Sequence, residues 1–444
     1  MEREYKDSGI EWIGKIPESW KIYRIKYNTF LKGRIGWQGL NSNDFIDEGY
    51  CLITGTDFDN RGGINWNTCY RISKERFDED ELLHIKKGDL LMTKDGTIGK
   101  MAYIDELPEE ASLNSHLLII RQITKLMDNK YLYWTMLSDI FVQFYNLFQS
   151  GTTMNSISQS TLGLFSTPCP PIPEQQLIAK YLDEKCGEID SLIGLQEQMI
   201  EKLKTYKQSV ITEAVTKGLN PYAKLVPSGI EWIGEIPEGW GINKLFNLCT
   251  IKGRVGWKGL RSDEFKEKSY AYLVTGQDFI SSDINWKNCY QIDKDRYEED
   301  PYIQLSNGDI LVTKDGTIGK IAKVSGMDKP ACLNSGIFVL KQRKETFFQN
   351  YLYWYLSSPL LLRYNTFINT GGTTIIHLYQ NVFERFSMIV PPMEEQKAIA
   401  AYLDEKCADI DRLVDLKQQK IEKLKDYKKS VIYEAVTGKT IIKS

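Results

Sequence analysis

The sequence predicts an α+β protein in which two similar mixed domains are joined by two long helices that pair as an antiparallel coiled coil, with internal pseudo-twofold symmetry. Three observations predict this fold class. The chain repeats itself over a domain-sized distance, each repeat mixes short β-forming runs with helical stretches, and each repeat ends in a long amphipathic segment. We expect mixed domains at residues 1–170 and 219–391 and helices at 171–218 and 392–444.

The internal repeat is visible as motifs that return in the same order. Ser-Gly-Ile-Glu-Trp-Ile-Gly at residues 8–14 returns at 228–234, an offset of 220 residues, and Thr-Lys-Asp-Gly-Thr-Ile-Gly-Lys at 93–100 returns at 313–320. A period of this length is far above the roughly 20–50 residues of solenoid repeats. Two like units in one chain suggest a protein that handles two like things.

Apolar runs rich in β-forming residues predict the strands of the first mixed domain, at residues 50–54, 89–93, 101–104 and 117–121. The Asp95-Gly96 step between two of these runs indicates a hairpin turn. Residues 129–148 are aromatic and free of Pro and Gly, so we expect one helix there. The Gly and Pro residues of the connector at 218–227 predict that the first long helix ends before it.

The segments 173–217 and 394–438 carry an apolar stripe whose positions are separated alternately by four and three residues. Eight of ten stripe positions are apolar in each copy, counting Cys and Ala, which is the pattern of a coiled-coil seam. The seam residues that we single out are Leu182, Ile189, Ile193, Ile200, Leu203, Val210, Leu403, Ile410, Val414, Ile421, Leu424 and Val431. So narrow a stripe needs a partner helix, and the chain supplies two of similar length. The alternative, in which each helix folds onto its own domain, fits the stripe less well.

The composition is that of an ordinary globular protein and excludes several classes. Over 444 residues the net charge is −3, which argues against a protein that coats nucleic acid by bulk charge but allows a basic face. No apolar run approaches the ~18 residues of a membrane span. The charged first residues do not resemble a secretory signal, so we expect a cytoplasmic protein. The eight cysteines and three histidines lack the spacing of zinc sites, so we expect packed, reduced thiols and no metal.

The strongest local motif is Thr-Lys-Asp-Gly-Thr-Ile-Gly-Lys, at residues 93–100 and 313–320. It is not a phosphate loop, because its two glycines are too close together and no Ser or Thr follows the final lysine. We interpret it as a hairpin or loop that exposes lysine, aspartate and threonine to phosphates or base edges, with a plain turn as the alternative. Its candidate DNA contacts are Lys94, Asp95, Thr97, Lys100, Lys314, Asp315, Thr317 and Lys320.

Two weaker motifs also recur. Lys-Gly-Arg-Ile-Gly-Trp at residues 32–37 matches Lys-Gly-Arg-Val-Gly-Trp at 252–257, and Gly-Thr-Thr at 151–153 matches Gly-Gly-Thr-Thr at 371–374. The glycines allow close approach of a ligand, the arginines suit guanine or phosphate, and the tryptophans suit either a sugar or base contact or burial. The further candidate DNA contacts are Lys32, Arg34, Trp37, Gln38, Thr152, Thr153, Lys252, Arg254, Trp257, Lys258, Thr373 and Thr374.

Catalytic machinery is hard to find in the sequence. There is no dinucleotide fingerprint, no nucleophile elbow and no Asn/Asp-Pro-Pro-Tyr/Phe element of an amino-methyltransferase. We therefore predict a non-catalytic chain that has no catalytic residue and no cofactor of its own. Catalysis by an unfamiliar set of carboxylates is the alternative.

Three of these features, taken together and in order, resemble one known family over essentially the whole chain. They are the opening motif at residues 8–20, the Gly-Asp-x-Leu-x-Thr-Lys-Asp-Gly-Thr-Ile-Gly loops, and the Pro-Pro starts of the long helices at 170–171 and 391–392. The chain resembles the specificity subunit of type I restriction-modification systems. Two other classes stay open: a stand-alone DNA-binding or scaffolding protein without methyltransferase partners, and an interaction module for another ligand.

The resemblance implies that each mixed domain is a target recognition domain that reads one half of a split, double-stranded DNA site. The helices would set the gap between half-sites and dock two modification subunits, which methylate adenine with S-adenosylmethionine. Restriction subunits would join them, with ATP and Mg²⁺ also bound in partner subunits. Because the copies share their candidate loops, we expect similar, inverted half-sites and a nearly palindromic target. The copies differ at Gln38 and its counterpart Lys258.

Overall fold

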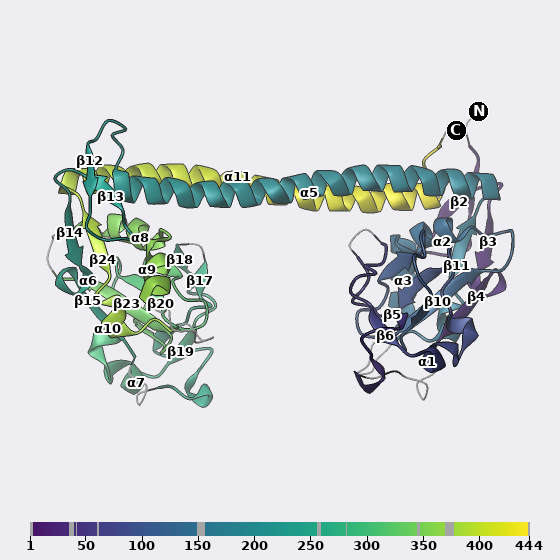
Figure 1. Ribbon diagram of the computed structural model, residues 1–444, viewed down its shortest axis with the longest axis horizontal. Helices are drawn as coiled ribbons and strands as arrows, with labels where there is room; N and C mark the ends of the chain where they lie inside the picture. The colour runs from purple at the N-terminus through teal and green to yellow at the C-terminus, as the bar shows by residue number, and fades with distance from the viewer. Residues whose placement is uncertain are drawn as a thin grey trace. The chain divides into compact units, whose positions relative to one another are not determined.

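The computed structural model describes residues 3–34, 40, 42–59, 62–148, 156–254, 259–280, 282–343, 347–368 and 377–442. Its contacts divide the chain into two units, which we call unit 1 (Met1–Glu197 with Gln419–Ser444) and unit 2 (Gln198–Gln418). Each long helix begins in one unit and ends in the other. Each unit therefore combines one mixed domain with parts of both helices (Figure 1).

Unit 1 is built on two sheets, and its strands include all four that the sequence predicts. The antiparallel sheet β4-β10-β7-β8 consists of β4 (Thr29–Gly33), β10 (Leu117–Gln122), β7 (Leu90–Thr93) and β8 (Met101–Tyr103). The sheet β6-β5-β9 consists of β6 (Tyr70–Ile72), β5 (Tyr50–Ile53) and β9 (Ala111–Leu113), with β5 and β9 parallel. Two further strand pairs are β1 (Tyr5–Asp7) with β2 (Lys15–Pro17), and β3 (Lys21–Arg24) with β11 (Ser166–Cys169).

The short helices of unit 1 are α1 (Lys74–Asp78), α2 (Asn129–Met136), α3 (Asp139–Phe148) and α4 (Gln159–Leu162), with 3-10 turns at Ile25–Tyr27, Ser42–Asp44 and Glu81–Leu83. The prediction of a single helix at 129–148 is wrong, because the chain breaks between α2 and α3. Ser138 explains the break: its hydroxyl donates to the carbonyl of Thr135 at 2.6 Å and accepts from the N–H of Ile140 at 3.3 Å. A serine that bonds nearby backbone groups in this way competes with the continuous helix.

Unit 2 repeats these elements in the same order. Its sheets are β15-β23-β20-β21, made of β15 (Cys249–Gly253), β23 (Ile337–Gln342), β20 (Ile310–Thr313) and β21 (Ile321–Lys323), and β19-β16-β22, made of β19 (Tyr290–Ile292), β16 (Ala271–Val274) and β22 (Ala331–Leu333). Paired strands are β12 (Leu225–Pro227) with β13 (Glu235–Pro237), β14 (Gly241–Lys244) with β24 (Ser387–Val390), and β17 (Phe279–Ile280) with β18 (Asp283–Ile284). Helices are α6 (Leu245–Leu248), α7 (Lys294–Glu298), α8 (Gln349–Ser357), α9 (Leu360–Ile368) and α10 (Gln380–Phe383), with 3-10 turns at Ser262–Glu264 and Pro301–Ile303.

The two long helices are α5 (Ile172–Lys217, 46 residues) and α11 (Met393–Val436, 44 residues), as the apolar stripe predicts. They run antiparallel in each unit. In unit 1 the ammonium of Lys428 lies 2.7 Å from a carboxylate oxygen of Asp190, and in unit 2 that of Lys207 lies 2.6 Å from Asp411. These two ion pairs are counterparts under the repeat, since each lysine and each aspartate recurs 221 residues later. The internal symmetry of the sequence is thus also present in the contacts of the helices.

The seam residues point inward along both helices. Leu182, Ile189, Ile200 and Val210 of α5 are buried, as are Leu403, Ile410, Ile421 and Val431 of α11, while Ile193, Leu203, Val414 and Leu424 are half-buried. This inward-facing row agrees with the coiled-coil seam that the spacing predicts.

The C-terminal end of each long helix lies in the core of a mixed domain. In unit 1 the hydroxyl of Tyr131 on α2 donates to the last helical carbonyl of α11, that of Val436, at 3.1 Å and to that of Pro168 at 2.9 Å. In unit 2 the hydroxyl of Tyr351 makes the matching bonds to Val215 of α5 at 3.3 Å and to Ile389 at 3.2 Å. The last carbonyls of a helix have no partner within the helix, so these hydroxyls satisfy groups that burial would leave unpaired.

No helix among the described residues is long and apolar enough to cross a membrane. The eight cysteine thiols are all free, and seven of them are buried. Burial raises the pKa of the Cys249 thiol to about 12 and that of Cys186 to about 11. These thiols are therefore protonated packing groups at neutral pH.

Candidate nucleic-acid interface

The loop at residues 93–100 joins β7 to β8 and is the predicted hairpin. Its fold is set by Thr93, whose hydroxyl donates to the carbonyl of Thr97 at 2.5 Å and accepts from the N–H of Lys100 at 3.0 Å. Gly96 and Gly99 have φ of 69° and 82°, a region that residues with a Cβ rarely adopt. The backbone conformation of this loop therefore requires glycine at both positions.

The same loop is rebuilt in unit 2 between β20 and β21. The hydroxyl of Thr313 donates to the carbonyl of Thr317 at 2.5 Å and accepts from the N–H of Lys320 at 2.9 Å. Gly316 and Gly319 again have positive φ, of 69° and 79°. The two repeats thus present the same backbone and the same side chains in this loop.

The side chains of these loops differ in how freely they reach solvent. Thr97, Lys100 and their counterparts Thr317 and Lys320 are exposed, while Lys94 and Lys314 are half-buried. Lys94 and Lys100 form no ion pair within the described part of the chain, and Lys314 lies over the ring of Phe338 at 5.2 Å.

The two aspartates of these loops contact histidines. Asp95 lies 3.4 Å from Nδ1 of His116, and a carboxylate oxygen of Asp315 contacts Nδ1 of His377. These two carboxylates therefore help to hold the neighbouring segments in place. The lysines and threonines of the loops are the groups that can donate hydrogen bonds to an external ligand.

Two further loops lie against the hairpin loop in each unit. A Cβ on Gly55 would lie 3.0 Å from the methyl group of Thr93, and the N–H of Lys94 donates to the carbonyl of His116 at 2.9 Å. In unit 2, Gly276 has the same distance to Thr313, and Lys314 donates to Gly336 at 2.9 Å. We call these three loops of each unit the loop cluster: residues 54–57, 93–100 and 114–116 in unit 1, and 275–278, 313–320 and 334–336 in unit 2.

The loop cluster gathers small polar donors at one end of the sheets. Thr56 and His116 of unit 1 are exposed, as are Thr97 and Lys100, and Gln277 and Ser335 are exposed in unit 2. Sequence reasoning missed the first and third loops of each cluster. Their signal was the recurrence of Thr-Gly-x-Asp at 54–57 and 275–278 and of Asn-Ser at 114–115 and 334–335.

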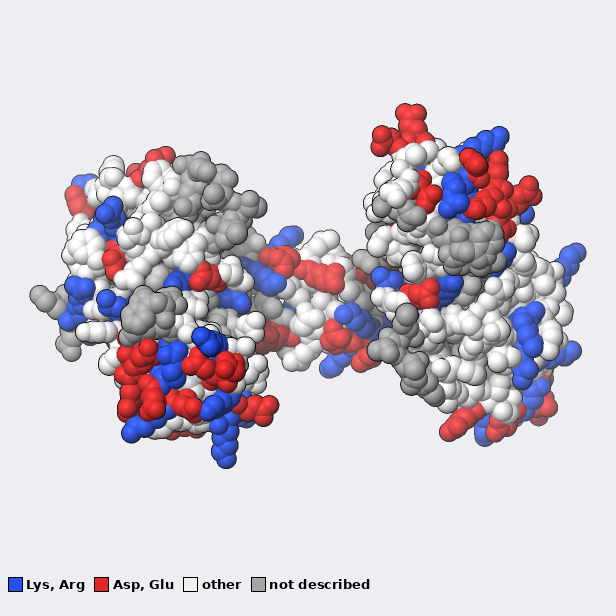
Figure 2. All heavy atoms as spheres, turned by 90° about the horizontal axis from the view of Figure 1, so that it is seen from below, with Lys and Arg blue, Asp and Glu red and all other residues white. Residues whose placement is uncertain are grey.

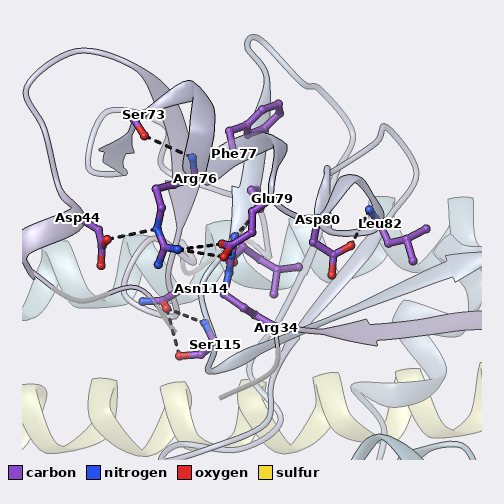
Figure 3. Close-up of polar contacts among 12 residues, drawn as sticks. Arg34, Asp44, Ser73, Arg76, Phe77, Glu79, Asp80, Leu82, Asn114 and Ser115 are labelled. Atoms are coloured by element: carbon purple, nitrogen blue, oxygen red, sulfur yellow. Dashed lines mark hydrogen bonds and ion pairs between the residues drawn. The ribbon is translucent and has the colours of Figure 1, made fainter. Parts of the chain in front are cut away.

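The prediction that Arg34 contacts DNA is wrong, because its guanidinium is buried and satisfied inside unit 1. Figure 3 shows it directed at Glu79, with Nη1 at 3.3 Å from that carboxylate. Nε donates to the carbonyl of Leu113 at 3.2 Å and Nη2 to the hydroxyl of Ser112 at 3.2 Å. Burial lowers the pKa of the Arg34 guanidinium, and Glu79 opposes this effect. Arg34 therefore fastens the end of β4 to the end of β9.

Arg254 repeats this structural role in unit 2, so its predicted DNA contact is also wrong. Its guanidinium is buried, with Nε donating to the carbonyl of Leu333 at 2.9 Å and Nη2 lying 3.4 Å from the thiol of Cys332. The two lysines of this motif are also engaged inside their units. Lys32 forms an ion pair of 2.9 Å with Asp80, and Lys252 lies over the ring of Tyr302 at 5.7 Å.

The remaining predicted contacts fall outside the described residues. They are Trp37, Gln38, Thr152, Thr153, Trp257, Lys258, Thr373 and Thr374. Within the described ranges, no group of three or more His, Cys, Asp or Glu could hold a metal ion. Figure 2 shows basic side chains in small groups beside acidic ones on the face that it displays. On this face, therefore, bulk positive charge does not mark out a binding surface.

Each long helix also exposes apolar side chains outside the seam. On α5 these are Leu192, Leu195, Met199 and Tyr206, which are 44–51% exposed and separated by three, four and seven residues. On α11 their counterparts Leu413, Leu416 and Tyr427 are exposed as well. This spacing places the residues of each helix along one face, and an exposed apolar row of this kind is typical of a protein-binding surface.

Comparison with known proteins finds one family model, described as type I restriction modification DNA specificity domain, which matches residues 36–205 and 237–426. The specificity subunit of the type I restriction enzyme MjaVIII from Methanocaldococcus jannaschii is 26% identical, over 97% of this chain and 95% of its own length. The specificity subunit of EcoKI from Escherichia coli is 20% identical, over 96% of this chain and 90% of its own length.

Solved structures share the fold. A chain from a study of complex assembly and conformational transition of the type I R-M system aligns with a TM-score of 0.73 at 16% identity, covering 96% of this chain and 99% of that one. The HsdS subunit from Thermoanaerobacter tengcongensis aligns with a TM-score of 0.52 at 15% identity, covering 96% and 98%.

Proposed function

Because this chain belongs to the family of type I restriction modification DNA specificity domains, which its two repeats match in turn, we propose that each repeat reads one half of a split DNA target. The observation that carries this proposal is the loop cluster. It recurs in both units with the same hydrogen bonds and exposes lysine and hydroxyl donors at each occurrence. Lysines suit the phosphate backbone, and threonine, histidine and glutamine suit base edges.

The differences between the clusters bear on the symmetry of the target. The hairpin loops are identical in sequence, but Thr56 corresponds to Gln277 and His116 to Gly336. Loops that are alike favour half-sites that are similar and inverted. We expect the half-sites to differ at the bases that these two positions contact. In unit 2, Gln277 can pair with adenine, and Gly336 has no side chain with which to contact a base.

The long helices act as the spacer in this proposal. The antiparallel seam and its repeated lysine–aspartate pairs support one fixed register of α5 against α11. A fixed register holds the gap between half-sites constant. The exposed apolar rows of α5 and α11 would dock two modification subunits, one row for each.

The chemistry of the complex belongs to the partners. The modification subunits bind S-adenosylmethionine and methylate adenine, and restriction subunits use ATP and Mg²⁺. This chain supplies the choice of site and no catalytic group.

The test is DNA binding and methylation by the full chain assembled with its modification subunits. Replacement of Lys94, Lys100 and their counterparts Lys314 and Lys320 by alanine lowers affinity for the target and flattens its dependence on salt concentration. Alanine at four exposed lysines of the long helices, Lys180, Lys202, Lys420 and Lys423, removes the same charge outside the loop clusters and is the matched control. Equal affinity of the loop variant and the control variant would refute the role of the loop clusters.

A further inference from the structure

The N-terminal segment of unit 1 fills a site made of a tryptophan, a carboxylate and a glycine carbonyl. Trp20 is fully buried, and its indole N–H donates to a carboxylate oxygen of Glu174 at 3.1 Å. The guanidinium of Arg3 lies over the Trp20 ring at 5.2 Å and pairs with the other oxygen of Glu174. It also donates to the carbonyl of Gly438 at 3.5 Å. These contacts are the set that selects a guanidinium: an aromatic face, a carboxylate and a carbonyl.

Unit 2 rebuilds this site and lacks the arginine. The indole N–H of Trp240 donates to Glu395 at 3.0 Å, as that of Trp20 does to Glu174. Gly218 packs against the Trp240 ring, where a Cβ would lie 2.9 Å from it, as Gly438 packs against Trp20. At the place of Arg3, however, the repeat carries Ala223.

A cavity lies where the guanidinium would be. It has a volume of about 450 Å³, and Trp240, Glu395, Gly218 and Ala223 line it. Trp240 is 9% exposed, whereas Trp20 under Arg3 is 0% exposed. The cavity is within the range of about 300–1,000 Å³ that is usual for binding pockets. The two units thus contain the same site in two forms: it is filled by Arg3 in unit 1 and open in unit 2.

We propose that the pocket between Trp240 and Glu395 binds an arginine side chain presented by a partner protein. The planar guanidinium stacks on the indole while its N–H groups reach the free oxygen of Glu395. An ammonium group has neither the flat face nor the fork, so lysine binds less well.

The other charges at the pocket are two lysines and one glutamate. Lys224 is held by Glu238 at 2.9 Å, which leaves that pair neutral. Lys217 is exposed at the end of α5 and opposes an incoming cation. Replacing Lys217 by alanine therefore tightens binding of a guanidinium.

The experiment titrates N-acetyl-arginine amide into the full chain and follows binding by saturation-transfer NMR. We expect one site, an affinity for the lysine analogue that is lower by about tenfold, and binding that is lost in Glu395→Gln. Glutamine keeps an oxygen for the Trp240 indole, so this variant stays folded. Glu174→Gln is the matched control and leaves binding unchanged, because Arg3 already occupies the site of unit 1.

A second variant fills the pocket from within. Ala223→Arg places the missing guanidinium on the chain itself, so it abolishes binding of the probe and raises the melting temperature, and Glu395→Gln cancels that rise. Absence of probe binding to the unmodified chain would overturn the proposal. Equal binding to Glu395→Gln, or equal affinity for the arginine and lysine probes, would overturn it as well.

Discussion

The junction between each long helix and its mixed domain depends on one tyrosine hydroxyl. Tyr131 is fully buried, and burial raises its pKa well above the ordinary value, so its hydroxyl stays protonated and donates at any physiological pH. Tyr131→Phe leaves the buried carbonyl of Val436 without this donor, while the carbonyl of Pro168 keeps a hydrogen bond from the hydroxyl of Thr167 at 3.1 Å. Leaving one buried polar group unpaired costs about 1–3 kcal/mol, and we take the middle of this range, about 2 kcal/mol, for the Val436 carbonyl.

Differential scanning calorimetry of the full chain measures this loss. For domains of about 150–250 residues, 2 kcal/mol corresponds to a fall in melting temperature of about 4–8 °C. Tyr351→Phe gives a fall of the same size, since its hydroxyl makes the matching bonds in unit 2. Tyr222→Phe is the control, because that ring is 92% exposed. A shift for Tyr131→Phe no larger than that of the control would refute this account of the junction.

Three other predictions follow from the same structure. Lys94→Ala combined with Lys314→Ala weakens binding to all duplexes and reduces the slope of log affinity against log salt by about one per lost phosphate contact, measured by fluorescence anisotropy; an unchanged slope would exclude phosphate contact. Residues 1–220 expressed alone form a dimer by light scattering at micromolar concentration, because α5 carries both members of the cross-helix lysine–aspartate pair and can pair with a second α5; a clean monomer would contradict the seam. Arg34→Met lowers the free energy of unfolding by about 1–3 kcal/mol, because it removes the buried hydrogen bonds from the guanidinium to Leu113 and Ser112, and it leaves the DNA affinity of the folded fraction unchanged; a loss of DNA affinity with normal stability would show that Arg34 contacts DNA.

The long helices and the hairpin loops were predictable from the sequence because each depends on local rules. A stripe of apolar residues with alternate steps of four and three residues predicts a coiled-coil helix, and α5 and α11 are such helices. The Thr-Lys-Asp-Gly-Thr-Ile-Gly-Lys loop was predictable for a similar reason. Two glycines with positive φ and a bridging threonine hydroxyl define the turn within eight residues.

Other features depend on contacts that no local pattern records. Arg34 lies in a glycine-rich motif that suits a ligand-binding loop, yet its partners Leu113 and Ser112 come almost 80 residues later. The break at Ser138 was missed because its residue type is tolerated inside helices, and only its hydrogen bonds show that it ends one. The loops at 54–57 and 114–116 join the cluster through the pairing of β5 with β9, which is set by the tertiary fold.

The central claim is that each repeat reads its own half-site through its own loop cluster. Sequencing of methylated adenines in DNA modified by the complete system tests it most directly, for the unmodified chain and for Thr56→Gln with His116→Gly, which gives unit 1 the cluster residues of unit 2. The account predicts a split target with two similar, inverted half-sites. The double substitution changes one half-site toward the other and leaves the gap and the second half-site unchanged. An unsplit target, two unrelated half-sites, or a change in both half-sites at once would contradict it.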